Sequence, residues 1–126
     1  MKINSLYLVK EVDDLKEVEN IDISEKITDV AKQITRASIT RFGHVYHINI
    51  AVNVKSITSA SPVLVANTDL RPIDSTELVC LYDGGGNDYR AIRTVISPTG
   101  EINILVNAGV SIPEGRFLTI FGTVII

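Results

Sequence analysis

The last third of the chain, from residue 77 to residue 126, consists of short alternating apolar and polar runs separated by glycine-containing breaks. Its final run, Phe117-Leu-Thr-Ile-Phe-Gly-Thr-Val-Ile-Ile126, continues to the last residue. An apolar strand left unpaired would be an exposed, aggregation-prone edge. We therefore expect this strand to be paired inside a sheet, so that the chain ends within its own fold.

Size and composition indicate one folded domain. The chain has 126 residues, of which 45% are hydrophobic and 21% are charged, as is typical of globular proteins. Its net charge of -3, with the arginines spread along the chain, argues against nucleic-acid binding, which needs a concentrated basic face. The single cysteine, Cys80, lies in an apolar run, so we expect it to be buried, and no internal disulfide can form.

The N-terminal residues lack the pattern of a signal peptide, because the first apolar residues soon meet the acidic run Glu11-Val-Asp-Asp14. No apolar stretch of the sequence approaches the length that crosses a bilayer. We therefore expect a protein that is made in the cytoplasm and is not inserted in a membrane.

Charge divides the chain into two parts. Residues 1–36 carry 14 of the 27 charged side chains and contain neither glycine nor proline. Within them, Asp22-Ile-Ser-Glu25 matches a capping box, which marks the start of a helix. Apolar side chains follow at spacings of four, three and four, which predicts one face of a helix: Ile23, Ile27, Val30 and Ile34. We predict an N-terminal charged helical segment over residues 1–36, used for attachment or trimerisation, whose apolar face covers the sheet domain or packs on a sister chain.

The remainder of the chain has the period-two alternation of strands. Gly43 lies between the first two of them and is expected to take a positive φ in a hairpin turn. Seven short strands separated by turn residues indicate a sandwich or a barrel. The predicted fold is mainly β: an antiparallel β-sandwich, jelly-roll-like, at residues 37–126, preceded by the short N-terminal α-helical segment. The predicted strands cover residues 37–41, 45–54, 63–66, 77–82, 89–96, 101–106 and 116–125.

The sequence contains no pattern that indicates catalysis. His44 and His47 are three residues apart on a strand and have no cysteine or carboxylate at ligand spacing, so we expect no metal. Gly84-Gly-Gly86 precedes a predicted strand instead of a helix, which favours a hairpin tip over a phosphate-binding loop. No nucleophile, base and carboxylate stand in a recognisable order. We predict a protein that is not an enzyme and that uses no cofactor.

One loop combines residue types that are typical of saccharide sites. Aromatic rings can contact the apolar face of a sugar, while carboxylates, amides and guanidinium groups bind its hydroxyls. The alternative interpretation is a solvated turn flanked by strand tyrosines. The candidate ligand-binding residues are Tyr82, Asp83, Asn87, Asp88, Tyr89 and Arg90.

Four short motifs between Ile39 and the last residue carry a family resemblance: Arg41-Phe-Gly-His-Val45, Leu70-Arg-Pro72, Ser97-Pro-Thr-Gly100 and Gly122-Thr-Val-Ile-Ile126. In this order, with strands between them, they resemble the C-terminal sandwich domains of tailed-phage tail-fibre and baseplate receptor-binding proteins. Related structural proteins of prophages in Gram-positive hosts are similar too.

The resemblance implies a function and a location. It implies a homotrimer, with three sandwiches around a threefold axis, that is part of the virion and contacts other tail or baseplate proteins. Three weak sites would then give useful avidity for a saccharide on the host cell surface. The alternative is a non-adhesive decoration or structural assembly protein of the virion.

Overall fold

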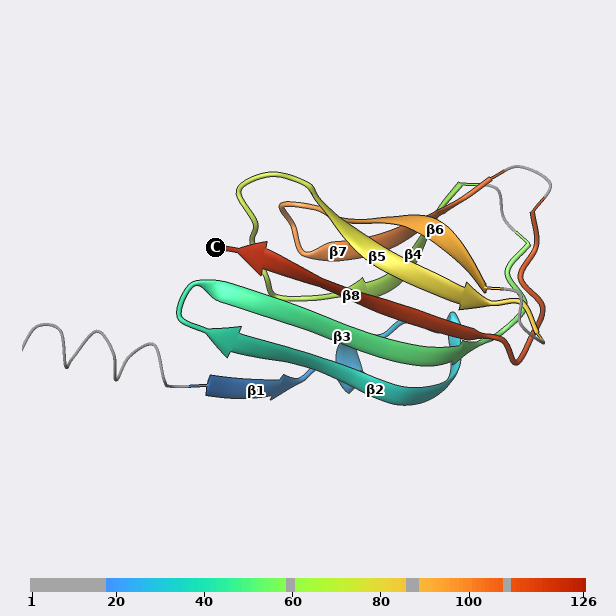
Figure 1. Ribbon diagram of the computed structural model, residues 1–126, viewed down its shortest axis with the longest axis horizontal. Coiled ribbons are helices and arrows are strands. Elements are labelled where there is room, and N and C mark those ends of the chain that lie inside the picture. Colours follow the sequence, from blue (N-terminus) through green and yellow to red (C-terminus); the bar gives the residue numbers. More distant parts are fainter. Residues whose placement is uncertain (1–17, 59–60, 86–88, 108–109) are drawn as a thin grey trace, which may run out of the picture.

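A computed structural model describes residues 18–58, 61–85, 89–107 and 110–126 of the chain. The fold is mainly β: eight strands form one antiparallel sheet in the order β1-β2-β3-β8-β5-β6-β7-β4. This sheet is curled, with β1, β2 and β3 on one side of the molecule and β4 to β7 on the other (Figure 1). The strands are β1 Val18–Asp22, β2 Ala31–Phe42, β3 Val45–Val54, β4 Ser61–Asn67, β5 Thr76–Asp83, β6 Tyr89–Ile96, β7 Glu101–Val106 and β8 Phe117–Ile125.

The seven strands predicted from the alternation are confirmed. Six of them lie within two residues of their expected bounds, and β2 begins six residues earlier than expected. The last of them, β8, is paired on both sides, with β3 and with β5, as the apolar run at the C-terminus requires. Gly43 has a φ of 63° in the turn between β2 and β3, also as predicted. In β3 the even-numbered side chains from Ile48 to Val54 are fully buried, so the predicted core face is confirmed.

The helix predicted across residues 22–34 is wrong. In its place the chain forms β1, one turn of 3-10 helix at Ser24–Lys26 and the first part of β2, which runs without a break through residue 36. The four apolar residues are Ile and Val, whose branched Cβ favours strands. Three of them reach the core without a helix, because Ile23 is buried and Ile27 and Val30 pack against buried residues, whereas Ile34 is exposed. Residues 1–17, the rest of the predicted segment, lie outside the described part of the chain.

Asp22 binds the start of the short 3-10 turn, but it is not the N-cap that the sequence predicted, because the residue at the N-cap position is Ile23 and it has no side-chain cap. The Asp22 carboxylate accepts hydrogen bonds from the backbone N–H of Ser24 at 2.9 Å and from its hydroxyl at 2.6 Å. These two bonds lower the pKa of Asp22 below its usual value. A side-chain oxygen that binds the amide two residues on forms a local turn, and such a turn does not need a helix after it.

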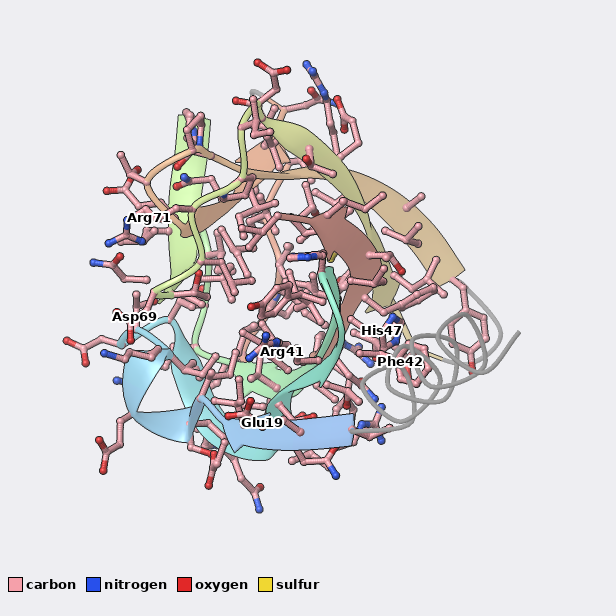
Figure 2. All side chains as sticks on the ribbon, turned by 90° about the vertical axis from the view of Figure 1, so that its left-hand side faces the viewer. Glu19, Arg41, Phe42, His47, Asp69 and Arg71 are labelled. Carbon is pink, nitrogen blue, oxygen red and sulfur yellow. The ribbon has the colours of Figure 1, made fainter. Side chains whose placement is uncertain are left out.

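The segment before β2 closes the sheet on itself. The backbone N–H of Thr28 donates to the carbonyl of Val65 in β4 at 2.9 Å, and Ile27 forms a bridge with Ala66. The outer edge of β4 therefore has hydrogen-bond partners although β4 is the last strand in the order. Seen from the end, the sheet surrounds an interior filled with side chains (Figure 2). A closed edge of this kind removes a site where another chain could add a strand.

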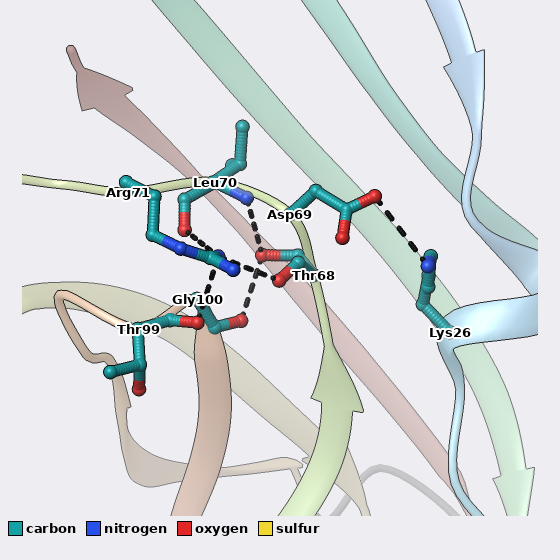
Figure 3. Close-up of polar contacts among 7 residues, drawn as sticks. All are labelled: Lys26, Thr68, Asp69, Leu70, Arg71, Thr99 and Gly100. Atoms are coloured by element: carbon teal, nitrogen blue, oxygen red, sulfur yellow. Dashed lines mark hydrogen bonds and ion pairs between the residues drawn. The ribbon is translucent and has the colours of Figure 1, made fainter.

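The loop between β4 and β5 is held against the turn between β6 and β7 (Figure 3). One guanidinium nitrogen of Arg71, Nη1, donates to the carbonyls of Thr68, Leu70 and Thr99 at 3.2, 2.8 and 2.9 Å. The buried hydroxyl of Thr68 donates to the carbonyl of Gly100 at 2.7 Å. Two of the four sequence motifs, Leu70-Arg-Pro72 and Ser97-Pro-Thr-Gly100, thus contact each other. Arg71 and Gly100, which make the motifs recognisable, stabilise the fold through these contacts.

Candidate functional site

The hairpin of β5 and β6 separates the predicted ligand-binding residues between two faces of the sheet. Tyr82 pairs with Arg90, and Asp83 pairs with Tyr89. Because successive side chains of a strand point to opposite faces, Tyr82 and Arg90 share the inner side, while Asp83 and Tyr89 share the outer side. Tyr82 is 8% exposed and Tyr89 is 66% exposed. Asn87 and Asp88, the remaining members of the predicted site, lie outside the described residues.

Asp83 shapes the tip of this hairpin. Its carboxylate oxygen Oδ1 accepts a hydrogen bond of 2.9 Å from the backbone N–H of Gly85. Gly85 has a φ of 97°, which other residues rarely adopt. A Cβ at Gly85 would lie 2.5 Å from the guanidinium nitrogen Nη1 of Arg116, so only glycine lets Arg116 pack against the tip. The role of Asp83 shown by these contacts is to hold the turn.

A cavity of about 540 Å³ opens beside β6, on the edge away from β5. β6 and β7 are paired only from Thr94 to Ile96 on β6 and from Ile102 to Ile104 on β7. Beyond these pairs, β6 forms one wall of the cavity, and the end of β7 with the segment after it forms the other. The side chains that bear polar groups on the lining are Tyr82, Arg90, Arg93, Asn107 and Ser111, and the apolar lining includes Ile92, Leu105, Val110 and Pro113.

The lining of this cavity is rich in hydrogen-bond donors. It contains two guanidinium groups, an amide and two hydroxyls, and no Asp or Glu among the described residues. Arg93 is already paired, because its Nε and Nη2 donate to Oε1 of Glu77 at 2.9 and 2.7 Å. This bond and the charge of Glu77 raise the pKa of Arg93. The arrangement suits an uncharged or anionic ligand that has several acceptor oxygens and one apolar face.

The structure therefore brings together part of the predicted site and adds residues that the sequence did not indicate. Tyr82 and Arg90 both line the cavity, whereas Asp83 and Tyr89 do not. Asn107, Val110 and Ser111 reach the cavity from a segment about 20 positions away along the chain. No local spacing could have found them, because the fold alone brings this segment beside β6.

Comparison of the sequence with protein families finds no matching family, and comparison with curated proteins finds no similar sequence. Among the described residues, no group of three or more His, Cys, Asp or Glu side chains is placed to hold a metal ion. Nor does the described part of the chain contain a helix long and apolar enough to span a membrane.

Proposed function

We propose that the chain is a virion component of a phage or prophage, a tail or baseplate head domain that binds a saccharide on the host cell surface. The observation that carries this proposal is the cavity of about 540 Å³, which is lined by Tyr82 and Arg90 of the predicted ligand site. The sequence resemblance to such head domains supports it independently. In that setting the domain binds and does not catalyse.

The strand pairing supports a jelly-roll fold for this head domain. β5 pairs with β6, β4 with β7, and β3 with β8, so the pairs are nested like one long hairpin. β8 also pairs with β5, and β7 also pairs with β6, so the strands of this long hairpin join in one curled sheet. Nested antiparallel pairs of this kind are typical of a jelly roll, which supports this part of the proposal. β1 takes the outer position beside β2.

The chemistry of the lining favours a small saccharide as the ligand. The volume falls in the range of sites for small molecules, about 300 to 1,000 Å³. Sugar hydroxyl and ring oxygens can accept hydrogen bonds from Arg90, Asn107 and Ser111, and Val110 offers an apolar contact for the C–H face of a ring. A single cavity of this size gives weak binding, and a homotrimer on a tail would multiply it through avidity. The residues before β1 would attach the trimer to other tail or baseplate proteins.

Calorimetric titration with saccharides from Gram-positive cell walls tests the proposal. In Val110→Trp an indole would fill the cavity, since Val110 lies at its exposed rim, and we expect the affinity to fall at least about tenfold. The matched control is Ile73→Trp, which adds the same ring at a residue that is 84% exposed and outside the cavity. If both variants bind like the wild type, the cavity is not the site.

The second candidate is a non-adhesive decoration or assembly protein. It is favoured by the exposed apolar side chains on the strands, which suit a protein partner better than a saccharide. A glycan array without signal, together with binding to tail particles, would select this alternative.

A further inference from the structure

The outward-pointing side chains of β3, β8, β5 and β6 form one continuous surface, which we call the outer face. Pairing aligns them in rows across the strands: Phe121 lies between Asn49 and Val79, and Thr119 lies between Ala51 and Leu81. The inward-pointing neighbours of these residues are buried in the core. His47, on the same strand as Asn49, lies on the outer side of the sheet in Figure 2.

The centre of the outer face carries no charge. Two of its strands, β3 and β8, present ten outward positions, and none of them is Lys, Arg, Asp or Glu. The next strand, β5, presents Val79 and Leu81 at its middle, and its charged residues Glu77 and Asp83 lie towards its two ends. In a chain with 21% charged residues, a solvent-facing sheet surface normally alternates with charged side chains. Ala51 is buried, and Asn49, Asn53, Thr119 and Phe121 are half-buried. The ten residues are Val45, His47, Asn49, Ala51, Asn53, Phe117, Thr119, Phe121, Thr123 and Ile125.

The outer face is also the most apolar exposed part of the described surface. Eleven large hydrophobic residues are exposed, and six of them belong to it: Val45, Val79, Leu81, Tyr89, Phe117 and Ile125. Val79 and Leu81, at the middle of the face, are 46% and 41% exposed. Depletion of charge and enrichment of aromatic residues mark the centre of protein interfaces.

Charged side chains at the border of the outer face mostly have partners, and Arg36 of β2, opposite Ala51, donates to the amide oxygen of Asn49 at 3.3 Å. Glu77 and Arg93 form an ion pair of 2.7 Å with each other, and the Asp83 carboxylate accepts the N–H of Gly85. The face therefore offers little to a nucleic acid, a charged peptide or a lipid headgroup, which all need charge on the protein. A surface of a second copy can pack on it, because the face presents few charges that would have to lose their water, and sheet faces pack well on other apolar surfaces.

We infer that the outer face is buried against a second copy of this chain. The inference deepens the proposed oligomer by naming the surface that joins its subunits, and it rests on that part of the proposed function. Residues 1–17 join the sheet at β1, and β2, β3 and β8 separate β1 from Val79 and Leu81 on β5. A second copy can reach the middle of the face directly.

Sedimentation equilibrium of the full chain across the micromolar range tests this inference. We expect the wild type to associate, and Leu81→Glu to raise its dissociation constant about 30-fold, as for a residue at the centre of an interface. Ile73→Glu is the matched control, because it adds the same charge at an exposed residue outside the face, and it should associate like the wild type. Circular dichroism of each variant checks that it is folded.

A second measurement does not depend on the variants. Hydroxyl-radical footprinting of the wild type should show Val79, Leu81 and Phe117 protected at high concentration and reactive at low concentration. Association that Leu81→Glu leaves unchanged would overturn the outer face as the interface and leave the oligomer in place. A wild type that stays monomeric would overturn both the oligomer and the interface. Protection of the three residues at every concentration would show that residues 1–17 of the same chain cover the face. The saccharide proposal is tested separately, by the titration of Val110→Trp.

Discussion

The hydroxyl of Thr28 donates a hydrogen bond of 2.6 Å to the backbone carbonyl of Leu64 in β4. The two residues are 36 positions apart and belong to opposite ends of the strand order, so this bond helps to close the curled sheet. The backbone N–H of Thr28 adds a second bond, to the carbonyl of Val65. One residue thus covers two carbonyls that an edge strand would otherwise present to solvent.

Replacing the Thr28 hydroxyl should weaken this closure. Thr28→Val keeps the shape of the side chain and leaves the Leu64 carbonyl without its donor, so the free energy of unfolding should fall by about 1 kcal/mol. Urea denaturation measures the change. Thr28→Ser retains the hydroxyl and should lose less, and equal stability of the Val and Ser variants would contradict the role of this bond.

Arg71 should contribute to stability through the three carbonyls that its Nη1 contacts. Arg71→Gln should lower the free energy of unfolding by about 1 to 2 kcal/mol, because the glutamine cannot reach all three acceptors. Arg36→Gln is the control, since the only hydrogen bond described for Arg36 is a long one of 3.3 Å to Asn49, and its effect should stay within about 0.5 kcal/mol. Saccharide binding should be the same in both folded variants.

Gly100 and Gly115 form a matched pair that separates backbone strain from a steric clash. Their φ values are 87° and 85°. A Cβ at Gly100 would lie 2.6 Å from the carbonyl oxygen of Leu70, whereas a Cβ at Gly115 would meet no atom within 4 Å. We expect Gly115→Ala to cost about 1 kcal/mol and Gly100→Ala at least about 2 kcal/mol more, measured by thermal unfolding. Similar losses of stability in the two variants would show that the loop before β5 makes no close steric contact with the turn at Gly100.

Cys80 is buried, and burial raises the pKa of its thiol from 9.0 to about 11. The folded protein then holds the thiol proton between these pH values while the unfolded chain releases it, so stability should decrease as the pH rises through this window. The decrease should be on the order of 2 kcal/mol larger in the wild type than in Cys80→Ala. A disulfide reagent should likewise react with the thiol at pH 8 only after denaturant is added. Prompt reaction of the folded protein would contradict the burial.

The strands could be predicted from the sequence because alternation is a local property. β3 shows this most clearly, since its fully buried residues Ile48, Ile50, Val52 and Val54 alternate with Asn49, Ala51 and Asn53, of which only Ala51 is buried as well. The N-terminal part could not be predicted in the same way. Ile23, Ile27 and Val30 have helical spacing, yet they cover the core from a strand end and a 3-10 turn, because the edge of β4 needs Thr28 as its partner.

Only part of the candidate site could be predicted from the sequence, because a sequence pattern is local and the site is not. Tyr82 and Arg90 are close in the chain and pair across a hairpin, so the local sequence pattern predicts that they lie together. The same pattern also includes Tyr89, but its side chain lies on the other face of the sheet because side chains alternate along a strand. Asn107 and Ser111 come from a distant segment and depend on how far β6 and β7 remain paired.

The most direct test of the proposed saccharide site is a titration of the isotope-labelled chain, followed by amide chemical shifts. We expect saturable shifts for Arg90, Ile92, Asn107 and Val110 around the cavity, with no change at Ile73 or on β2. The same saccharide should leave the spectrum of Val110→Trp unchanged. Shifts that are absent, or that persist in Val110→Trp, would contradict a saccharide site between β6 and residues 107–113.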